Sequence, residues 1–124
     1  MRFLDTSVAV DHLRGHAPAT VLLEGLVSDA VPLVSSEVVR FELLAGARSP
    51  DQGLEAFFEV LDWVPVTEAV ARAAAAYARD FRGSHSGIDD ADYLIAATAA
   101  LLDAPLLTTN VRHFPMLDGL EAPY

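Results

Sequence analysis

Four oxygen-bearing side chains of this sequence could together bind a divalent cation, and they are Asp5, Glu42, Asp92 and Asn110. Carboxylates that crowd together repel one another, so at neutral pH a cation must neutralise them. Oxygen ligands favour Mg²⁺ or Mn²⁺, which keep waters and substrate phosphates as their remaining ligands. Such a metal activates a water as nucleophile and offsets charge on phosphate oxygens. The chemistry indicated is phosphodiester hydrolysis.

Asp92 is the carboxylate that helix capping explains least well. It lies in the stretch SGIDDADYLIAATA, which is expected to form a helix from about residue 89 to 102. Asp89 and Asp90 suit the positive end of this helix, where carboxylates accept bonds from free N–H groups. Asp92 instead shares a helical face with Ile95 and Ala96, which is the face expected to be buried. A carboxylate directed at a core needs a partner or a cation.

The order of the predicted elements indicates an α/β fold. Apolar runs predict strands at 2–5, 31–36, 63–66 and about 105–109, with a short fifth at 120–123. Between them, caps and periodicity predict helices at about 7–14, 18–27, 37–46, 50–60, 67–81 and 89–102. Strands separated by helical crossovers form a parallel sheet of four to five strands with helices on both faces. Such sheets place their chemistry at the carboxyl ends of the strands, and all four candidate residues are expected there.

Each candidate residue also has an ordinary structural interpretation. Asp5 would cap the helix that follows the first strand. Glu42 would be a solvated helix residue paired with Arg40 or Arg48, and Asn110 would be a polar turn residue. The histidines show no paired metal-ligand spacing and are interpreted as surface or core-edge residues: His12, His16, His85 and His113. The convergence of the four oxygen-bearing residues is therefore the main indication of a site.

Composition bounds the class of protein. The 124 residues are expected to form one domain over 1–124, with a net charge of −10 that argues against a general basic surface for nucleic acid. There is no Cys, which excludes thiolate chemistry and favours a cytoplasmic setting. All eight basic residues are Arg, so every mechanism that requires a lysine is excluded. Neither a signal peptide nor a membrane-spanning segment is expected.

Four motifs, in this order, resemble those of PIN-domain ribonucleases, specifically the VapC toxins of toxin–antitoxin pairs. They are FLDTSV near the amino terminus, EVVRFELLAGA, GIDDADYLIAATA and LLTTNVRHFPML. The resemblance covers nearly the whole chain. It implies a single PIN domain and a Mg²⁺-dependent endoribonuclease, in which Mn²⁺ would substitute, that hydrolyses RNA by metal-activated water.

The resemblance also assigns roles and partners. It implies that Asp5, Glu42 and Asp92 take the three acidic active-site positions and that Asp5 and Asp92 are the metal ligands. It further implies a homodimer and a VapB-type antitoxin whose tail enters the acidic groove. Asn110 takes a fourth position that is often Asp in this family, and its neutral amide adds no charge for a second metal.

Three other functions remain open from the residues. A housekeeping PIN nuclease without an antitoxin would have the same fold and site. A non-catalytic PIN interaction module would be expected to have lost one of the three acids. A small-molecule phosphatase would more often carry a second Asp two residues after the first, where this chain has Ser7.

Overall fold

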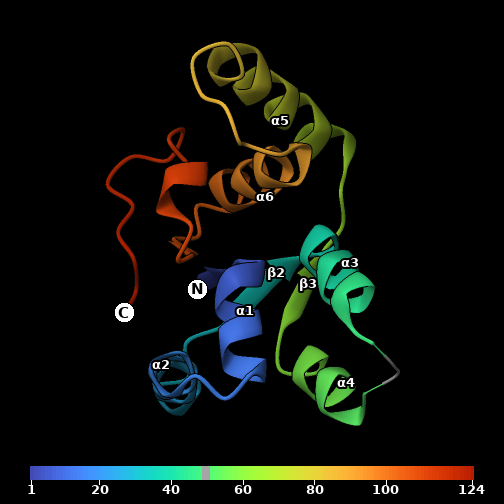
Figure 1. Ribbon diagram of the computed structural model, residues 1–124, viewed down its shortest axis with the longest axis vertical. Coiled ribbons are helices and arrows are strands. Elements are labelled where there is room, and N and C mark those ends of the chain that lie inside the picture. Colours follow the sequence, from blue (N-terminus) through green and yellow to red (C-terminus); the bar gives the residue numbers. More distant parts are fainter. Residues whose placement is uncertain (49–50) are drawn as a thin grey trace.

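The structure is a computed structural model that describes residues 1–48 and 51–124. Four strands and six α-helices alternate along the described chain, and a 3₁₀ turn follows the last strand (Figure 1). In chain order they are β1 (Arg2–Leu4), α1 (Thr6–Leu13), α2 (Ala17–Ser28), β2 (Leu33–Ser36), α3 (Glu37–Gly46), α4 (Gln52–Phe58), β3 (Asp62–Val64), α5 (Glu68–Phe81), α6 (Asp90–Leu101), β4 (Leu106–Leu107) and η1 (Val111–His113).

The four strands form one parallel sheet in the order β3-β2-β1-β4. In its register, Phe3 of β1 lies beside Val34 of β2 and Leu106 of β4. The predicted parallel α/β architecture is confirmed. The fifth strand expected at 120–123 is wrong, because that segment is irregular in the structure. All four carboxyl ends lie at one edge of the sheet.

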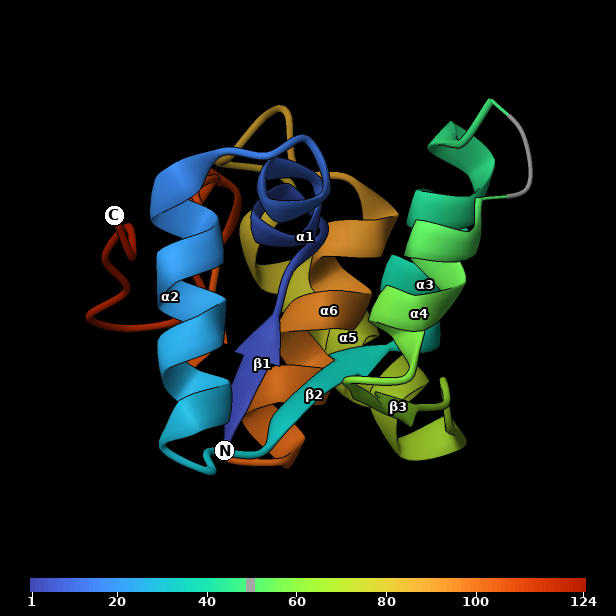
Figure 2. The same cartoon turned by 90° about the horizontal axis from the view of Figure 1, so that it is seen from below.

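Helices cover both faces of the sheet. Figure 2 shows α1, α2 and α4 in front of β1 and β2, with α5 and α6 behind them. Helix α6 lies directly against the sheet, and α5 packs on the outer side of α6 through a smaller cluster that includes Val70, Ala74 and Tyr93. The small side chains of Ala96 and Ala97 on α6, both fully buried, let this helix approach the sheet and α5 closely.

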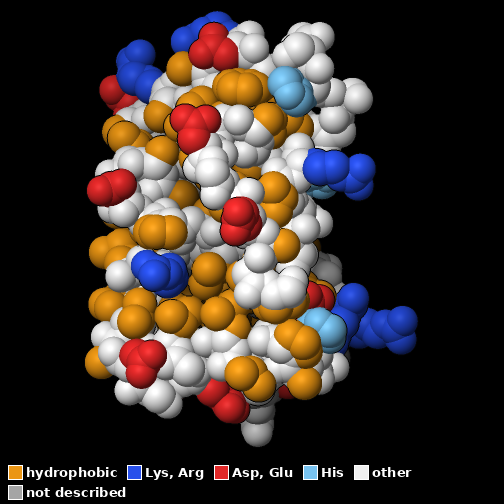
Figure 3. All heavy atoms as spheres, turned by 90° about the vertical axis from the view of Figure 1, so that its left-hand side faces the viewer, with side chains coloured by type: hydrophobic (Ala, Val, Ile, Leu, Met, Phe, Trp, Pro, Cys, Tyr) orange, Lys and Arg blue, Asp and Glu red, His pale blue; other side chains and the backbone are white. Residues whose placement is uncertain are grey.

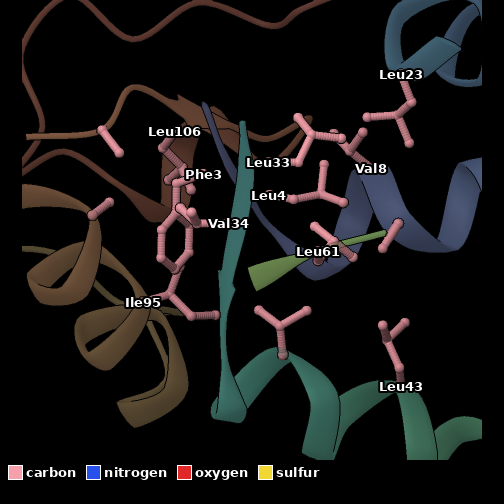
Figure 4. Packing of buried hydrophobic residues seen from close by; sticks show 14 of the residues in the cluster. Phe3, Leu4, Val8, Leu23, Leu33, Val34, Leu43, Leu61, Ile95 and Leu106 are labelled. Carbon is pink, nitrogen blue, oxygen red and sulfur yellow. The ribbon is translucent and has the colours of Figure 1, made fainter. Parts of the chain in front are cut away.

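The core follows the alternation of side chains along the strands. Phe3 and Val34 point toward Ile95 of α6, whereas Leu4 and Leu33 point to the opposite face, toward α1 (Figure 4). Successive strand residues face opposite sides of a sheet, so two short strands supply both halves of the core. Burial of these apolar side chains is the main stabilising contribution to the fold.

Several element boundaries differ from those expected. Strand β3 ends at Val64 and not at 66, because Pro65 has no N–H to donate to the neighbouring strand. The expected start of α4 at Pro50 lies outside the described residues, and the described helix begins at Gln52, where Asp51 accepts a hydrogen bond from the N–H of Gly53. Within 1–48 and 51–124, no helix combines the length and apolar character needed to cross a bilayer.

Figure 3 shows one face of the molecule, on the left-hand side of Figure 1. Acidic side chains on this face stand singly among hydrophobic and neutral ones. The acidic side chains form no contiguous patch on this face.

We predict that Ile95→Ala lowers the free energy of unfolding by about 2–5 kcal/mol, because the lost side chain leaves a cavity between α6 and the sheet. Leu101→Ala, on the same helix but 55% exposed, should change it by less than about 0.5 kcal/mol. Urea unfolding followed by circular dichroism measures both. Equal losses for the two variants would contradict this description of the core.

Candidate active site

A cavity of about 270 Å³ opens at the carboxyl edge of the sheet. Residues from four separate regions of the chain line it: Asp5, Thr6, Ser7, Val10, Asp11, Glu42, Asp92, Thr109 and Asn110. All four candidate residues are among them, so the structure brings together the set that the strand ends predicted. The topology explains this, since β1, β4 and the amino ends of α3 and α6 meet at the same edge.

Asp5 follows β1 and is 3% exposed. It occupies the N-cap position of α1, but its carboxylate makes no capping hydrogen bond. Instead Oδ2 accepts hydrogen bonds from the hydroxyls of Ser7 (3.0 Å) and Thr108 (2.7 Å). Capping therefore does not account for this buried carboxylate. Its position in the cavity leaves it available to a cation.

Hydroxyl groups connect Asp5 to the segment after β4. The N–H of Thr109 donates to Ser7 Oγ (3.1 Å), and the N–H of Asn110 donates to Thr108 Oγ1 (3.0 Å). The two hydroxyls are 3.2 Å apart. Thr108 was not among the residues predicted for the site, although the hydroxyl residues beside Asp5 and Asn110 were a usable signal. These bonds fix the distance between the first and last strands at the cavity.

Glu42 lies on α3 and takes its partner from α1. The hydroxyl of Thr6 donates to Glu42 Oε1 at 2.7 Å. Arg40, one of the two arginines considered as partners for Glu42, pairs with Glu37 instead, at 2.8 Å. Thr6, like Thr108, was not among the residues predicted for the site. Glu42 is thus directed toward the cavity by a hydroxyl and not toward solvent by an arginine.

Asp92 serves two purposes at the start of α6. Its Oδ2 accepts a hydrogen bond from the N–H of Asp89 at 3.1 Å, which completes half of a capping box. Asp89 is the N-cap residue and Asp90 lies in the first turn, as expected, but the expectation that capping belongs to these two residues alone is wrong, because Asp92 caps as well. The carboxylate of Asp90 instead pairs with Arg82 at 2.6 Å. One carboxylate both caps the helix and lines the cavity.

Asn110 and His113 belong to one turn at the rim of the cavity. The backbone carbonyl of Asn110 accepts a bond from the N–H of His113 at 2.9 Å, and within the described chain no hydrogen bond is made by its amide side chain. His113 Nδ1 lies 3.3 Å from Asp92 Oδ2. The interpretation of His113 as an ordinary surface or core-edge residue missed this contact. Its position three residues after Asn110 was the available signal.

The pKa values of Glu42 and Asp92 are raised, chiefly by burial and also by neighbouring carboxylates. Burial raises the pKa of Glu42, the negative charges of Asp5 and Asp92 add to the rise, and the Thr6 hydroxyl partly opposes it. Burial also raises the pKa of Asp92, with Asp5 contributing, whereas the Asp89 N–H and His113 lower it. The unfavourable charged form is what a bound cation would stabilise.

The donor set fits a hard divalent ion that is only partly enclosed by protein. Within the ranges 1–48 and 51–124, no three His, Asp or Glu side chains are close enough to hold a metal ion by themselves. Mg²⁺ is commonly bound by one or two carboxylates, with waters and phosphates completing the shell. Asp5 and Asp92, the two residues expected to be ligands, both line the cavity and would supply these two carboxylates.

Comparisons with known proteins agree with the fold. The family model described as PIN domain matches residues 2–120. The chain is 56% identical to ribonuclease VapC19 of Mycobacterium tuberculosis, with all of both chains covered. It is 41% identical to ribonuclease VapC10 of the same organism, over all of this chain and 93% of the relative. A toxin–antitoxin complex from Klebsiella pneumoniae contains a chain with the same fold, at a TM-score of 0.82 and 23% identity over 100% of this chain and 98% of that one.

We predict that Glu42→Gln raises the Tm of the metal-free protein by about 2–5 °C at pH 7.5. A raised carboxyl pKa in the folded state means that stability is lost as the pH rises above the usual value near 4.5, and Gln removes that loss while keeping an acceptor for Thr6. The gain should disappear as the pH falls toward 4.5.

Differential scanning fluorimetry at several pH values, in buffer with a chelator, measures this effect. Glu24→Gln, at an exposed position of α2, controls for the removal of one negative charge from a chain of net charge −10. A gain that is independent of pH, or equal in the two variants, would show that Glu42 is not under electrostatic strain.

Proposed function

This chain belongs to the PIN-domain family and to its VapC branch, and we propose that it is a Mg²⁺-dependent endoribonuclease, the toxin of a toxin–antitoxin pair. One observation carries the proposal. The carboxylates of Asp5, Glu42 and Asp92, which follow β1 or lie on α3 and α6, are among the groups that line one small cavity, and the pKa values of Glu42 and Asp92 are raised there. A nuclease site that depends on a divalent cation requires such a concentration of negative charge.

In this proposal Asp5 and Asp92 hold the metal. A bound Mg²⁺ or Mn²⁺ would supply an activated water and a positive charge for the phosphate oxygens of RNA. Asp5 is kept in place through Oδ2 by Ser7 and Thr108, so its other oxygen is available to a ligand. These hydroxyls donate hydrogen bonds to the carboxylate and so fix its orientation.

Glu42 is assigned to the attacking water. Thr6 occupies Oε1, which leaves Oε2 to accept a hydrogen bond from a water in the cavity. A carboxyl group whose pKa lies above its usual value is a better proton acceptor than an ordinary glutamate near neutral pH. Glu42 therefore orients the water and takes its proton.

Asn110 contributes an uncharged group at the rim. Its amide can donate a hydrogen bond to an RNA phosphate oxygen or accept one from water through its carbonyl. Because it adds no negative charge, we assign one metal to the free protein and place any second ion with the RNA phosphates. This assignment follows from the uncharged amide of Asn110, which lines the cavity beside Asp5, Glu42 and Asp92.

The proposed protein partner is a VapB-type antitoxin. The structural neighbour from Klebsiella pneumoniae is described as a toxin–antitoxin complex, and two relatives at 56% and 41% identity are named VapC ribonucleases. An acidic cavity attracts a cationic side chain, so an Arg or Lys of the antitoxin would occupy the position of the metal. We also propose a homodimer, for which Phe41 and Leu44 of α3, 69% and 47% exposed, offer apolar surface.

We predict that Asp5→Asn lowers the rate of RNA cleavage by about 100-fold or more, because a metal ligand loses its charge while its shape is kept. Asp103→Asn, at an exposed position beyond the far end of α6, makes the same chemical change away from the cavity and should retain the wild-type rate. Cleavage of total RNA with added Mg²⁺, followed by sequencing of the new ends, measures the rate and identifies the cut sites.

Two results would refute the proposed function. Full cleavage by Asp5→Asn would place the chemistry elsewhere. Cleavage by the wild-type chain that is unchanged by a chelator would exclude the divalent ion. Growth arrest on expression of wild-type chain, absent with Asp5→Asn, would support the toxin role.

A further inference from the structure

The turn η1 brings an imidazole against one of the carboxylates of the cavity. His113 Nδ1 lies 3.3 Å from Asp92 Oδ2, although the two residues belong to different elements. The Asp92 side chain is 15% exposed and that of His113 is 44% exposed. The contact therefore lies at the boundary between the cavity and solvent, on the Asn110 side of the site.

Both contacts to Asp92 use the same oxygen. Oδ2 accepts the N–H of Asp89 at 3.1 Å and also faces His113 Nδ1, whereas within the described chain Oδ1 has no hydrogen-bond partner. The Asp89 N–H restrains this carboxylate, and a hydrogen bond from His113 to the same oxygen would restrict its rotation further. Its second oxygen then has a fixed direction relative to the cavity that Asp92 lines.

The backbone of η1 holds His113 firmly enough for this role. Its N–H donates to the carbonyl of Asn110 at 2.9 Å, and the next residue, Phe114, is 1% exposed in the core. The N–H of Phe114 donates to the carbonyl of Val111 at 3.1 Å. The backbone of His113 is thus fixed between Asn110 at the rim of the cavity and the buried residue Phe114. The position from which the imidazole extends is therefore fixed as well.

We propose that His113 is a positioning residue, which donates a hydrogen bond from Nδ1 to Asp92 Oδ2 and so leaves Oδ1 to bind the divalent cation. The proposal rests on the proposed metal-dependent function and deepens it. In this proposal the short segment from Asn110 to His113 has two roles. It positions the Asn110 amide at the rim of the cavity, and it orients Asp92 as a metal ligand. Groups that hydrogen-bond to a metal ligand commonly contribute about 10–100-fold to metal affinity.

Replacing His113 by Asn or by Gln tests where the hydrogen-bond donor must lie, because both side chains carry an amide donor but place it differently. The amide nitrogen of Asn superimposes on Nδ1 of histidine, whereas that of Gln superimposes on Nε2 and is directed away from Asp92. His113→Asn should therefore retain Mn²⁺ affinity within about twofold, and His113→Gln should lose about tenfold. His85→Asn, which alters an exposed histidine bonded to Ser84, is the matched control and should behave as wild type.

The test is a Mn²⁺ titration by calorimetry without RNA, at pH 8, where an ordinary imidazole is neutral and the comparison reports hydrogen bonding. The kinetics of RNA cleavage at saturating Mg²⁺ provide a second readout. His113→Gln should lower kcat with little change in KM, and His113→Asn should restore it. Melting curves establish that each variant is folded.

The outcomes decide the proposal independently of the function. Equal Mn²⁺ affinity in the Asn and Gln variants, whether both normal or both reduced, would overturn the positioning role. If the wild type binds Mn²⁺ but cleaves no RNA, the proposed function fails and the affinity comparison still decides the role of His113. A wild type that binds no Mn²⁺ would overturn both proposals.

Discussion

The carboxylate of Asp5 is buried at the end of the first strand without a cationic partner among the described residues, and the surrounding structure follows from this constraint. Two hydroxyls, from Ser7 and Thr108, hold one of its oxygens and connect β1 to the segment after β4. Neutral donors orient a carboxylate without cancelling its charge. An arginine would have compensated the charge and closed the site to a metal. The hydroxyl network keeps the charge and still satisfies hydrogen bonding.

The same principle governs the other two carboxylates. Glu42 accepts the Thr6 hydroxyl, and Asp92 accepts a backbone N–H, so each is directed by a group that carries no formal charge. Three arginines of the described chain form pairs with acidic residues outside the cavity, namely Arg40, Arg72 and Arg82. Burial and mutual repulsion consequently raise the pKa of Glu42 and of Asp92. The folded chain tolerates this destabilisation because the sheet and the buried face of α6 supply a large apolar core.

The amino-acid sequence was sufficient to predict the architecture and the gathering of the four candidate residues, because strand ends and helix starts are readable from apolar runs and caps. Asp5 and Asn110 follow strands of one parallel sheet, so topology alone brings them together. The partners of these residues were harder to predict. The bond between Thr6 and Glu42 joins positions 36 residues apart, and the contact between His113 and Asp92 depends on the path of a short 3₁₀ turn. Side-chain contacts of this kind depend on tertiary packing, which periodicity does not report.

The central claim is that the cavity at the carboxyl edge of the sheet holds a divalent cation between Asp5 and Asp92. Anomalous diffraction from crystals grown with Mn²⁺ tests it most directly, because the scattering locates the metal without reference to activity. We expect an anomalous peak in the cavity, at a coordination distance of about 2.1 Å from one oxygen of each carboxylate. The peak should be absent in crystals of Asp5→Asn grown under the same conditions. No peak in the wild type, or a peak bound only by other residues, would contradict the account.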